Sequence, residues 1–246
     1  METDKVIEAA EKRGFINKSQ SELLELLHKE ESLCDELKPY VFKSTVGGNM
    51  ISHPLVIELF YDPKRCALLN YRLQAKKEML KRYKAAGNWH GYIYAHERPY
   101  RIQALCDVQR RGVTDPKLIT SVWIDSENLW QHRTLWKLIW ASMPDPHAVM
   151  DTNEKTVYDM MPNKVELHRG IRHKRHNRRG MSWTRDKERA SWFANRYKGQ
   201  KGLEPVVLSC VVPKKNILAF FNGRGEEECV IMPHKLPRKI TEFKIG

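Results

Sequence analysis

The sequence predicts an α+β fold, in which a mainly helical N-terminal part packs on a β-sheet domain. Apolar residues recur at helical spacing up to about residue 110. The last third of the chain instead carries short runs of β-branched and aromatic residues bounded by Gly or Pro, which favour strands. Helices segregated from strands along a chain are typical of the α+β class. We therefore expect a helical region at 1–110 and a second domain at 111–246.

The composition indicates a globular chain with an unusual positive charge. Hydrophobic residues make up 41% of the 246 positions, which is enough for a core and argues against disorder. Lys and Arg total 43 against 30 Asp and Glu, a net charge of +13. Such a balance favours a polyanionic partner, commonly nucleic acid, although many basic proteins have no such partner. The charge alone does not decide between these alternatives.

The sequence disfavours membrane proteins and metalloproteins. It contains no long apolar run and no signal-peptide core at its start, so we expect a cytoplasmic protein with no membrane partner. Its cysteines form no CxxC pair, and no His cluster has zinc-site spacing. We expect free, mostly buried thiols and no metal at these positions: Cys34, Cys66, Cys106, Cys210 and Cys229.

The first 110 residues favour helices around one irregular stretch. We expect broken helix to about residue 38, an irregular segment at 39–63 with a strand near Val56–Tyr61, and helix again to about residue 86. The aromatic run 89–96 is a candidate strand, and a helix follows it. Next, Asp115 before Pro116 is a good helix start.

A tryptophan-rich segment follows at 122–142. Asp125 and Ser126 are expected to cap a helix whose buried stripe includes Trp136, Ile139 and Trp140. Tryptophans at near-helical spacing are more often core residues than a ligand platform. We expect this helix to be the main packing partner of the sheet.

Three motifs stand in order in the last third of the chain. An apolar run ends in Arg169-Gly170, Gly-Met-Ser-Trp-Thr at 180–184 leads into a helix at 190–197, and Ile217–Phe221 precedes an Asn-Gly-Arg-Gly turn. Further strands are expected at 206–212 and near the C-terminus. After the turn, period-2 alternation places Glu226 and Glu228 on the same face of the last strand.

This ordered trio resembles the arginine–serine–glutamate signature of mono-ADP-ribosyltransferases of the cholera-toxin-like class. The resemblance implies a split β-sheet core and NAD as a consumed substrate. It implies that Arg169 binds NAD, that Ser182 and Thr184 shape the nicotinamide pocket, that Glu228 is the catalytic glutamate and that Glu226 faces the acceptor. The middle motif departs from the usual Ser-Thr-Ser, because Trp183 stands between the two hydroxyls.

The resemblance also implies further contacts with NAD. Gly170 follows the arginine, and an aromatic ring from Trp183, Phe220 or Phe221 is placed to stack on nicotinamide or on a target base. Residues 89–233 resemble, more widely, uncharacterised bacterial and phage-borne proteins with a transferase-like C-terminal half. This similarity suggests a toxin, a phage-defence protein or a phage effector, and it leaves open an antitoxin or chaperone as a partner.

A strongly basic run separates the first two motifs. Three readings compete for it: an exposed loop that attracts counterions, a clamp on the NAD pyrophosphate, and a contact with a nucleic-acid backbone. The candidate phosphate-contacting residues are Arg172, Lys174, Arg175, Arg178 and Arg179, together with Arg224 in the later turn.

The chemistry explains why carboxylates are expected at these positions. Breaking the nicotinamide–ribose bond builds positive charge on the ribose, which a fixed carboxylate at Glu228 would stabilise. A second carboxylate at Glu226 would orient or deprotonate the acceptor. The sequence therefore predicts ADP-ribosyl transfer from NAD to a macromolecule, with nucleic acid favoured over protein. The alternatives are transfer to a protein arginine, NAD hydrolysis, and nucleic-acid binding on a degenerate transferase fold.

Overall fold

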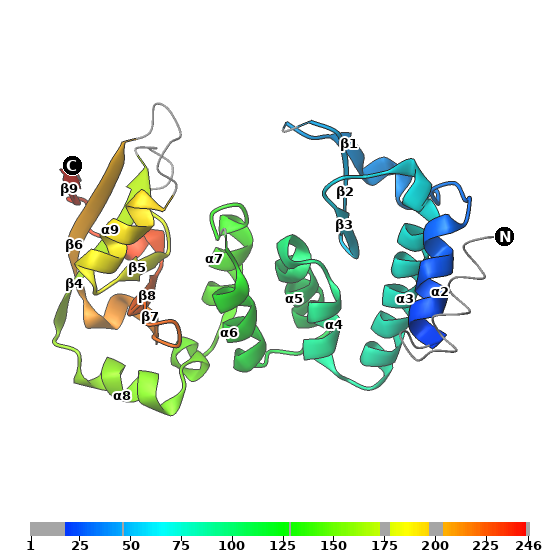
Figure 1. The fold of residues 1–246 in the computed structure, drawn as a ribbon. Helices are drawn as coiled ribbons and strands as arrows, with labels where there is room; N and C mark the ends of the chain where they lie inside the picture. The colour runs from blue at the N-terminus through cyan, green and yellow to red at the C-terminus, as the bar shows by residue number, and fades with distance from the viewer. Residues whose placement is uncertain (1–17, 46, 128, 173–177, 197–203, 245–246) are drawn as a thin grey trace. The chain divides into compact units, whose positions relative to one another are not determined.

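The computed structural model describes residues 18–45, 47–127, 129–172, 178–196 and 204–244, and it divides into two compact units (Figure 1). Unit 1 spans Met1–Val108 and unit 2 spans Gln109–Gly246. The dividing point lies within helix α5 (Arg101–Arg110), and the boundary expected from the sequence lies at the end of the same helix. Each unit combines helices with antiparallel strands, in agreement with the α+β class.

Unit 1 contains a small antiparallel meander where the sequence predicted an irregular segment with one strand. Strands β1 (Val41–Lys43), β2 (Asn49–His53) and β3 (Val56–Glu58) are hydrogen-bonded in that order. Strands this short carry too few residues for alternation to be recognised. Among the described residues, the α-helices before α5 are α2 (Lys18–His28), α3 (Cys66–Ala85) and α4 (Trp89–Ala95). The core contains Leu33, Leu37, Ile51, Leu55, Val56, Leu69 and Leu73.

The aromatic run 89–96 forms helix α4, so the predicted strand is wrong. Asn88 caps the helix, because its Oδ1 accepts a hydrogen bond from Gly91 N at 2.9 Å. His90 and Tyr94, four residues apart, stack with their ring centroids 4.3 Å apart. Residues at i and i+4 meet on a helix surface. This cap and this stacked pair outweigh the strand preference of the aromatic residues, which depends on context.

Unit 2 is organised around a six-stranded antiparallel sheet with the order β7-β8-β5-β4-β6-β9. The apolar runs at 165–170, 206–212 and 217–221 and the Ser-Trp-Thr motif are all strands, as predicted. The strands are β4 (Lys164–Arg172), β5 (Ser182–Thr184), β6 (Pro205–Pro213), β7 (Ile217–Phe221), β8 (Glu228–Ile231) and β9 (Thr241–Lys244). The helices after α5 are α6 (Pro116–Asp125), α7 (Arg133–Ser142), α8 (Thr152–Met160) and α9 (Lys187–Asn195).

The sheet is nearly divided between β4 and β5. Strand β4 pairs with β6 along its whole length, but it meets β5 at a single pair, His168 and Thr184. On its other side, β5 pairs with β8 along all three of its residues. Where β4 and β5 separate, their backbone groups need partners from elsewhere. This opening lies beside Arg169 and Ser182.

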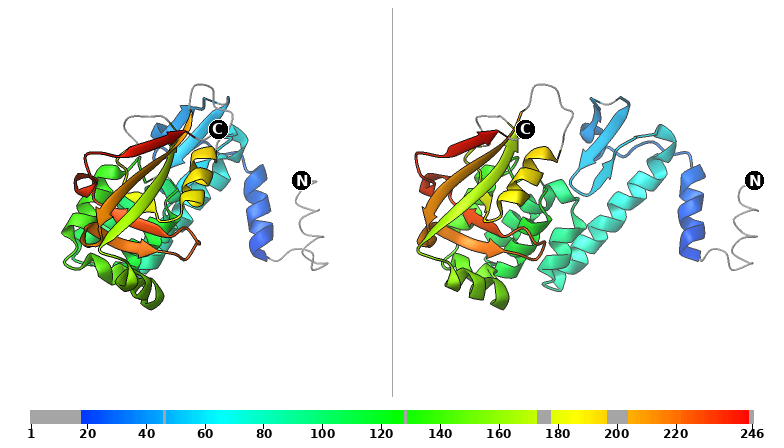
Figure 2. Two further views of the ribbon diagram at one scale, coloured as in Figure 1. Left: turned by 90° about the vertical axis from the view of Figure 1, so that its left-hand side faces the viewer. Right: turned by 60° about the vertical axis from the view of Figure 1, so that its left-hand side comes forward.

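The two faces of the sheet are covered differently (Figure 2). Alternate residues of β4, including Val165 and Leu167, pack into an apolar core with Tyr158 of α8. On the opposite face α9 lies directly against β4 at Gly170, where a Cβ atom would lie only 1.9 Å from Ala190 O. Gly170 therefore allows the helix to approach the strand. This packing explains the glycine, for which the resemblance implied a contact with NAD.

The tryptophan-rich segment contains parts of two helices. The helix start predicted at Asp125 and Ser126 is wrong. Asp125 is the last residue of α6, and α7 begins only at Arg133. The predicted stripe of Trp136, Ile139 and Trp140 is buried, as expected. Trp123 of α6 joins it in edge-to-face contacts, with centroids 4.9 Å from Trp136 and 5.4 Å from Trp140. The apolar periodicity agrees with the buried stripe, whereas Asp125 and Ser126 mark the end of α6 and not the start of α7.

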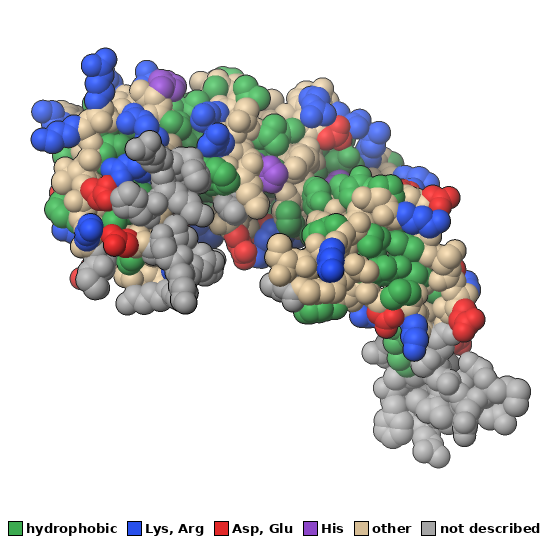
Figure 3. Space-filling model, turned by 90° about the horizontal axis from the view of Figure 1, so that it is seen from above, with side chains coloured by type: hydrophobic (Ala, Val, Ile, Leu, Met, Phe, Trp, Pro, Cys, Tyr) green, Lys and Arg blue, Asp and Glu red, His purple; other side chains and the backbone are tan. Residues whose placement is uncertain are grey.

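The positive charge is concentrated in unit 2. Of the 43 Lys and Arg and 30 Asp and Glu, residues 109–246 hold 26 and 15, whereas residues 1–108 hold 17 and 15. The net charges are therefore +11 and +2. Lys and Arg side chains are spread over the face of unit 2 drawn in Figure 3. Within the described residues, none of the helices combines the length and apolar character needed to cross a membrane. All five cysteines are free.

Candidate active site

Strand β5 brings the predicted site residues together. Thr184 is paired with His168 of β4 on one side and with Glu228 of β8 on the other. Directly paired residues of antiparallel strands share a face, and Ser182, two residues before Thr184, shares it too. The three sequence motifs thus meet at the junction of β4, β5 and β8. The structure places Ser182, Thr184 and Glu228 there, and Arg169 next to His168.

Arg169 closes the gap between β4 and β5. Its Nη1 donates a short hydrogen bond to the backbone carbonyl oxygen of Ser182. Gly180 makes room for the guanidinium, since a Cβ atom at that position would lie 2.5 Å from the Arg169 Cζ. Burial lowers the pKa of Arg169 to about 10, against the opposing influence of the Glu228 carboxylate. Arg169 therefore remains a cation at neutral pH, close to Glu228.

Glu228 is a buried carboxyl group, with only 5% of its surface exposed. Burial raises its pKa, while hydrogen bonding from Ser182 and Trp123 and the charge of Arg224 partly oppose that rise. Trp123 Nε1 is buried with no partner at normal hydrogen-bond distance among the described residues, so its influence on Glu228 is the weaker of the two. An ionisable group in this setting is a candidate for catalysis.

The turn before Glu228 has a different geometry from the one predicted. Strand β8 begins at Glu228, and Glu227 has a φ of 44°, which is uncommon for a residue other than glycine. The expected alternation of Glu226 and Glu228 along one strand is therefore wrong. The Glu226 carboxylate is bound instead by Arg224, 2.8 Å away, within the turn. It remains close enough to Glu228 to raise the pKa of that carboxyl group.

The Asn-Gly-Arg-Gly turn is held by contacts that the sequence did not reveal. Gly225 N donates to Asn222 O at 2.8 Å, which confirms the predicted turn. The buried Glu154 of α8 accepts a hydrogen bond from Asn222 N at 2.9 Å, and its other oxygen completes a capping box with Asp151. The Asp-x-x-Glu spacing signals the capping box. It gives no sign of the contact with a turn 68 residues away.

Thr184 links the site to helix α9. Its Oγ1 donates to Glu226 O at 2.7 Å and accepts a hydrogen bond from Asp186 N at 2.9 Å. Asp186 in turn caps α9 through Glu188 N and Arg189 N. Both contacts of the Thr184 hydroxyl are within the protein. Its role in the structure is to fix the turn, where the resemblance implied a wall of the nicotinamide pocket.

The aromatic residues predicted to stack on a ligand belong to the core. Trp183, Phe220 and Phe221 are 2%, 1% and 3% exposed. Trp183 lies on the face of β5 opposite Ser182, and its Nε1 donates to Gly180 O at 2.8 Å. Phe221 packs near Trp140 of α7, with centroids 6.5 Å apart. The prediction of a stacking surface is therefore wrong for all three, because alternation and the tryptophan helices bury them.

Most of the predicted phosphate-binding arginines that the structure describes are bound within the protein. Arg178 pairs with Glu242 of β9 through a short contact. Arg179 donates to the backbone oxygens of Pro233, Leu236 and Pro237 at 2.8 to 3.1 Å. These contacts fasten the C-terminal segment to the sheet, and the predicted phosphate contacts of Arg178 and Arg179 stay predictions.

Arg224 has the same kind of intramolecular role. It donates to Ile124 O at 2.7 Å in addition to its pair with Glu226, and so joins the turn to the end of α6. Arg172 lies at the end of β4 and is partly buried. Lys174 and Arg175 lie outside the described residues. The predicted contacts of Arg172, Lys174 and Arg175 with phosphate stay predictions.

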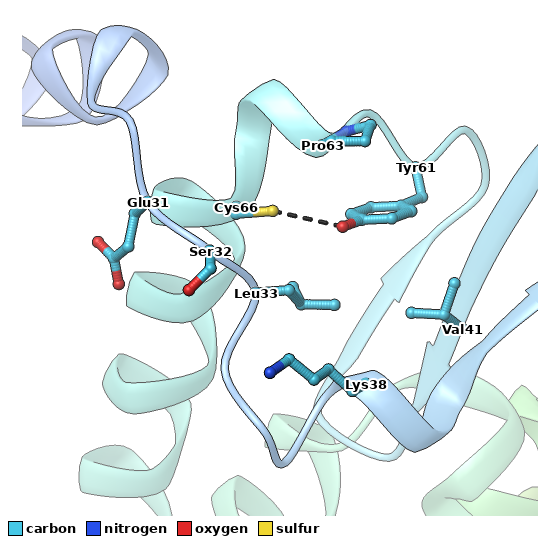
Figure 4. A pocket seen from close by; sticks show the side chains of 8 residues that line it. All are labelled: Glu31, Ser32, Leu33, Lys38, Val41, Tyr61, Pro63 and Cys66. Atoms are coloured by element: carbon cyan, nitrogen blue, oxygen red, sulfur yellow. Dashed lines mark hydrogen bonds between the residues drawn. The ribbon is translucent and has the colours of Figure 1, made fainter.

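A separate hollow lies in unit 1 (Figure 4). It measures about 520 Å³ and is lined by Glu31, Ser32, Leu33, Lys38, Val41, Tyr61, Pro63 and Cys66. Tyr61 Oη and Cys66 Sγ face each other at 3.4 Å, and burial raises the pKa of Tyr61 to about 12. This tyrosine is neutral at physiological pH. The hollow contains none of the predicted site residues.

Comparisons with known proteins add no relative. No family model matches the chain. The searches of curated proteins and of solved structures likewise found no match.

Proposed function

We propose that this chain is an NAD-dependent mono-ADP-ribosyltransferase acting on a macromolecular acceptor, with nucleic acid favoured over protein. The observation that supports this most is the meeting of Arg169, Ser182 and Glu228 at the junction of β4, β5 and β8. These residues come from three separate motifs. The resemblance of the sequence motifs in residues 89–233 to bacterial and phage-borne proteins extends the proposal to a toxin, phage-defence or phage-effector role.

The residues present suit NAD as a substrate. Arg169 is a fixed cation with a pKa of about 10, which can hold a phosphate or ribose oxygen of NAD. In the proposed reaction the nicotinamide–ribose bond breaks, nicotinamide leaves as a neutral molecule, and the ribose carbon gains positive charge. Glu228, whose charged form Ser182 favours, would stabilise that charge from a buried position, where electrostatic interactions are stronger than in water.

The geometry sets two conditions on this mechanism. With 5% of its surface exposed, Glu228 becomes accessible to NAD only if a neighbouring group moves, and Trp123 and the 222–227 turn are the groups beside it. Glu228 must also be ionised, and burial raises its pKa. Turnover should therefore rise with pH as this carboxyl group loses its proton. In this proposal Glu226, which pairs with Arg224, orients or deprotonates the acceptor.

The test uses NAD labelled in its adenylate part, the full-length chain and a cell lysate. Glu228→Gln keeps the side-chain shape and removes the charge, and we expect NAD consumption to fall about 100-fold or more. Glu227→Gln is the matched control, because it alters the adjacent carboxylate, which pairs loosely with Arg185 at 3.8 Å. We expect this control to retain most of the activity. Glu226→Gln should reduce transfer more than NAD hydrolysis.

The labelled products are then digested with RNase, DNase or protease. Glu228-dependent label that is released only by a nuclease supports transfer to nucleic acid. Label that only protease releases identifies a protein acceptor, and free ADP-ribose alone identifies a glycohydrolase. If the wild-type chain consumes no NAD in lysate or buffer, or if Glu227→Gln and Glu228→Gln lose activity equally, the proposal is wrong.

A further inference from the structure

Helix α9 has one face in the core and an aromatic ring on the opposite face. Ala190 and Ala194 are fully buried against the sheet. Trp192 lies two residues from each of them, which places it about 200° around the helix. It is 50% exposed, although other tryptophans of unit 2, such as Trp123 and Trp183, are 1% and 2% exposed. An indole on the outer face contributes little to the folding of this unit.

Two arginines flank this indole. Arg189 and Arg196 lie three residues before and four residues after Trp192, which is the spacing of neighbours on one helix face. Their Cζ atoms lie 5.7 Å and 5.6 Å from the Trp192 ring. Both distances are within the range of cation–π contacts. The outer face of α9 therefore presents a flat ring between two guanidinium groups, and we call Arg189, Trp192 and Arg196 the α9 patch.

The α9 patch adjoins the candidate active site. Arg189 Nη2 donates to Gly225 O at 3.0 Å, in the turn that leads into Glu226 and Glu228. The helix itself starts directly after β5, where Asp186 bonds both Thr184 and the first turn of α9. A chain lying along the outer face of α9 would thus reach the turn that carries the proposed acceptor-side carboxylate.

The charge of this unit selects among macromolecular partners. With 26 Lys and Arg against 15 Asp and Glu, residues 109–246 attract polyanions. An arginine-rich protein segment would be repelled by the two guanidinium groups. Single-stranded nucleic acid fits both features, since arginines bind its phosphates and exposed aromatic rings stack on its unpaired bases. In a duplex the bases are already stacked on each other and offer no face to Trp192.

We propose that the α9 patch is a docking surface for single-stranded nucleic acid, with a base stacked on Trp192 and phosphates on Arg189 and Arg196. The bound strand is the acceptor delivered to Glu226 and Glu228. This second statement rests on the proposed transferase function, whereas the binding itself does not.

The test measures binding of the full-length chain to fluorescein-labelled 12-nucleotide single strands of RNA and of DNA, and to a 12-base-pair duplex. Trp192→Ala should weaken single-strand binding about tenfold or more, and Trp192→Phe should recover most of it. Trp130→Ala is the matched control, because Trp130 is also exposed, at 38%, and has Arg133 5.4 Å from its ring. We expect less than a twofold change for this control.

Salt dependence tests the arginines separately from the stacking. Replacing both Arg189 and Arg196 with alanine should reduce the slope of log Kd against log salt by about 1.4, since each phosphate contact on a single strand contributes about 0.7. Arg133→Ala should leave the slope nearly unchanged. A melting temperature close to wild type would verify that each variant is folded.

The outcomes separate the docking surface from the transferase function. Loss of single-strand binding in Trp192→Ala, together with Glu228-dependent NAD use, supports both. If the strands bind through Trp192 but NAD is never consumed, the docking surface stands and the transferase function is wrong. If NAD is consumed but Trp192→Ala binds single strands like wild type, the docking surface is wrong. Equal losses in Trp192→Ala and Trp130→Ala, or duplex bound as tightly as single strands, also overturn the docking surface.

Discussion

The two units use their cations differently. In unit 1, several basic side chains pair with acidic ones: Glu58 binds Arg65 at 3.2 Å and Arg72 at 3.0 Å. The same pattern occurs between Lys76 and Glu97 at 2.7 Å. Such pairs neutralise charge, and residues 1–108 carry a net charge of only +2.

Unit 2 uses several arginines to bind backbone carbonyl groups. Arg179, Arg189 and Arg224 each donate to at least one carbonyl oxygen of a distant segment. A carbonyl group satisfies a guanidinium donor without cancelling its charge. Unit 2 can therefore fasten its loops and still keep a net charge of +11 over residues 109–246. Net charge alone does not show which cations are available to a partner, because the same arginine can anchor a loop and contribute to the field.

The largest expected loss of stability comes from a substitution in unit 2 and should be confined to that unit. Gly170→Ala places a Cβ atom 1.9 Å from Ala190 O and 2.6 Å from Ala194 N, and these backbone atoms cannot move without displacing α9. We expect the free energy of unfolding to fall by about 3 kcal/mol or more. Hydrogen exchange should show lost protection in unit 2 and retained protection in unit 1. Gly223→Ala is the control, because its Cβ would meet no atom within 4 Å, and it should change stability by less than about 0.5 kcal/mol. Equal protection loss in both units would show that they do not unfold separately.

Arginines that bind backbone carbonyls should contribute more to the free energy of unfolding than the exposed ion pairs do. Arg179→Ala removes three hydrogen bonds to the carbonyls of Pro233, Leu236 and Pro237. We expect the free energy of unfolding, measured in urea, to fall by about 1 to 2 kcal/mol. Three hydrogen bonds would give more, but the guanidinium is largely exposed to water. Arg179→Lys should lose somewhat less, since an ammonium keeps the charge but lacks the planar array of donors. If both variants were as stable as wild type, the arginine–carbonyl contacts of unit 2 would contribute nothing to its stability.

Glu228 should make stability depend on pH. Its pKa is raised in the folded state, so the protonated form is favoured by folding and stability declines as pH rises through that pKa. Glu228→Gln should therefore melt at a higher temperature than wild type at pH 8, and the difference should shrink below the ordinary glutamate pKa of about 4.5. Melting curves from pH 4 to 8 test this sign. A variant that is less stable than wild type at pH 8 would mean that the ionised carboxylate is well solvated or paired.

The smallest expected effect comes from an ion pair of unit 1. Lys81 lies 2.7 Å from Glu78, and both side chains are largely exposed. Lys81→Ala should cost about 0.3 kcal/mol in urea unfolding and nothing measurable in 0.5 M salt. If Lys81→Ala lowered the free energy of unfolding as much as Arg179→Ala does, cations in ion pairs and arginines bound to carbonyl groups would not differ in their contribution to stability.

The sequence by itself determined the local elements and the order of the motifs. Alternation and continuous apolar runs identified β4, β6 and β7, and the Asn-Gly-Arg-Gly turn followed from glycine's tolerance of positive φ, seen at Gly225 with a φ of 62°. The motifs around Arg169, Ser182 and Glu228 could be singled out because each has its own local pattern. Their meeting at one junction was an expectation of the resemblance.

Only the tertiary structure decided how those residues are used. The 44° φ of Glu227 moves Glu226 out of the strand, and this value is set by packing of the turn rather than by the Glu-Glu-Glu sequence. Arg179 finds its carbonyl partners 54 to 58 residues away, and Trp123 reaches Glu228 from another part of the chain. Local patterns depend on backbone sterics and periodic burial, which a short window of sequence contains. Partners and burial depend on chain segments that only folding brings together, and these decided which arginines anchor loops and which aromatic rings belong to the core.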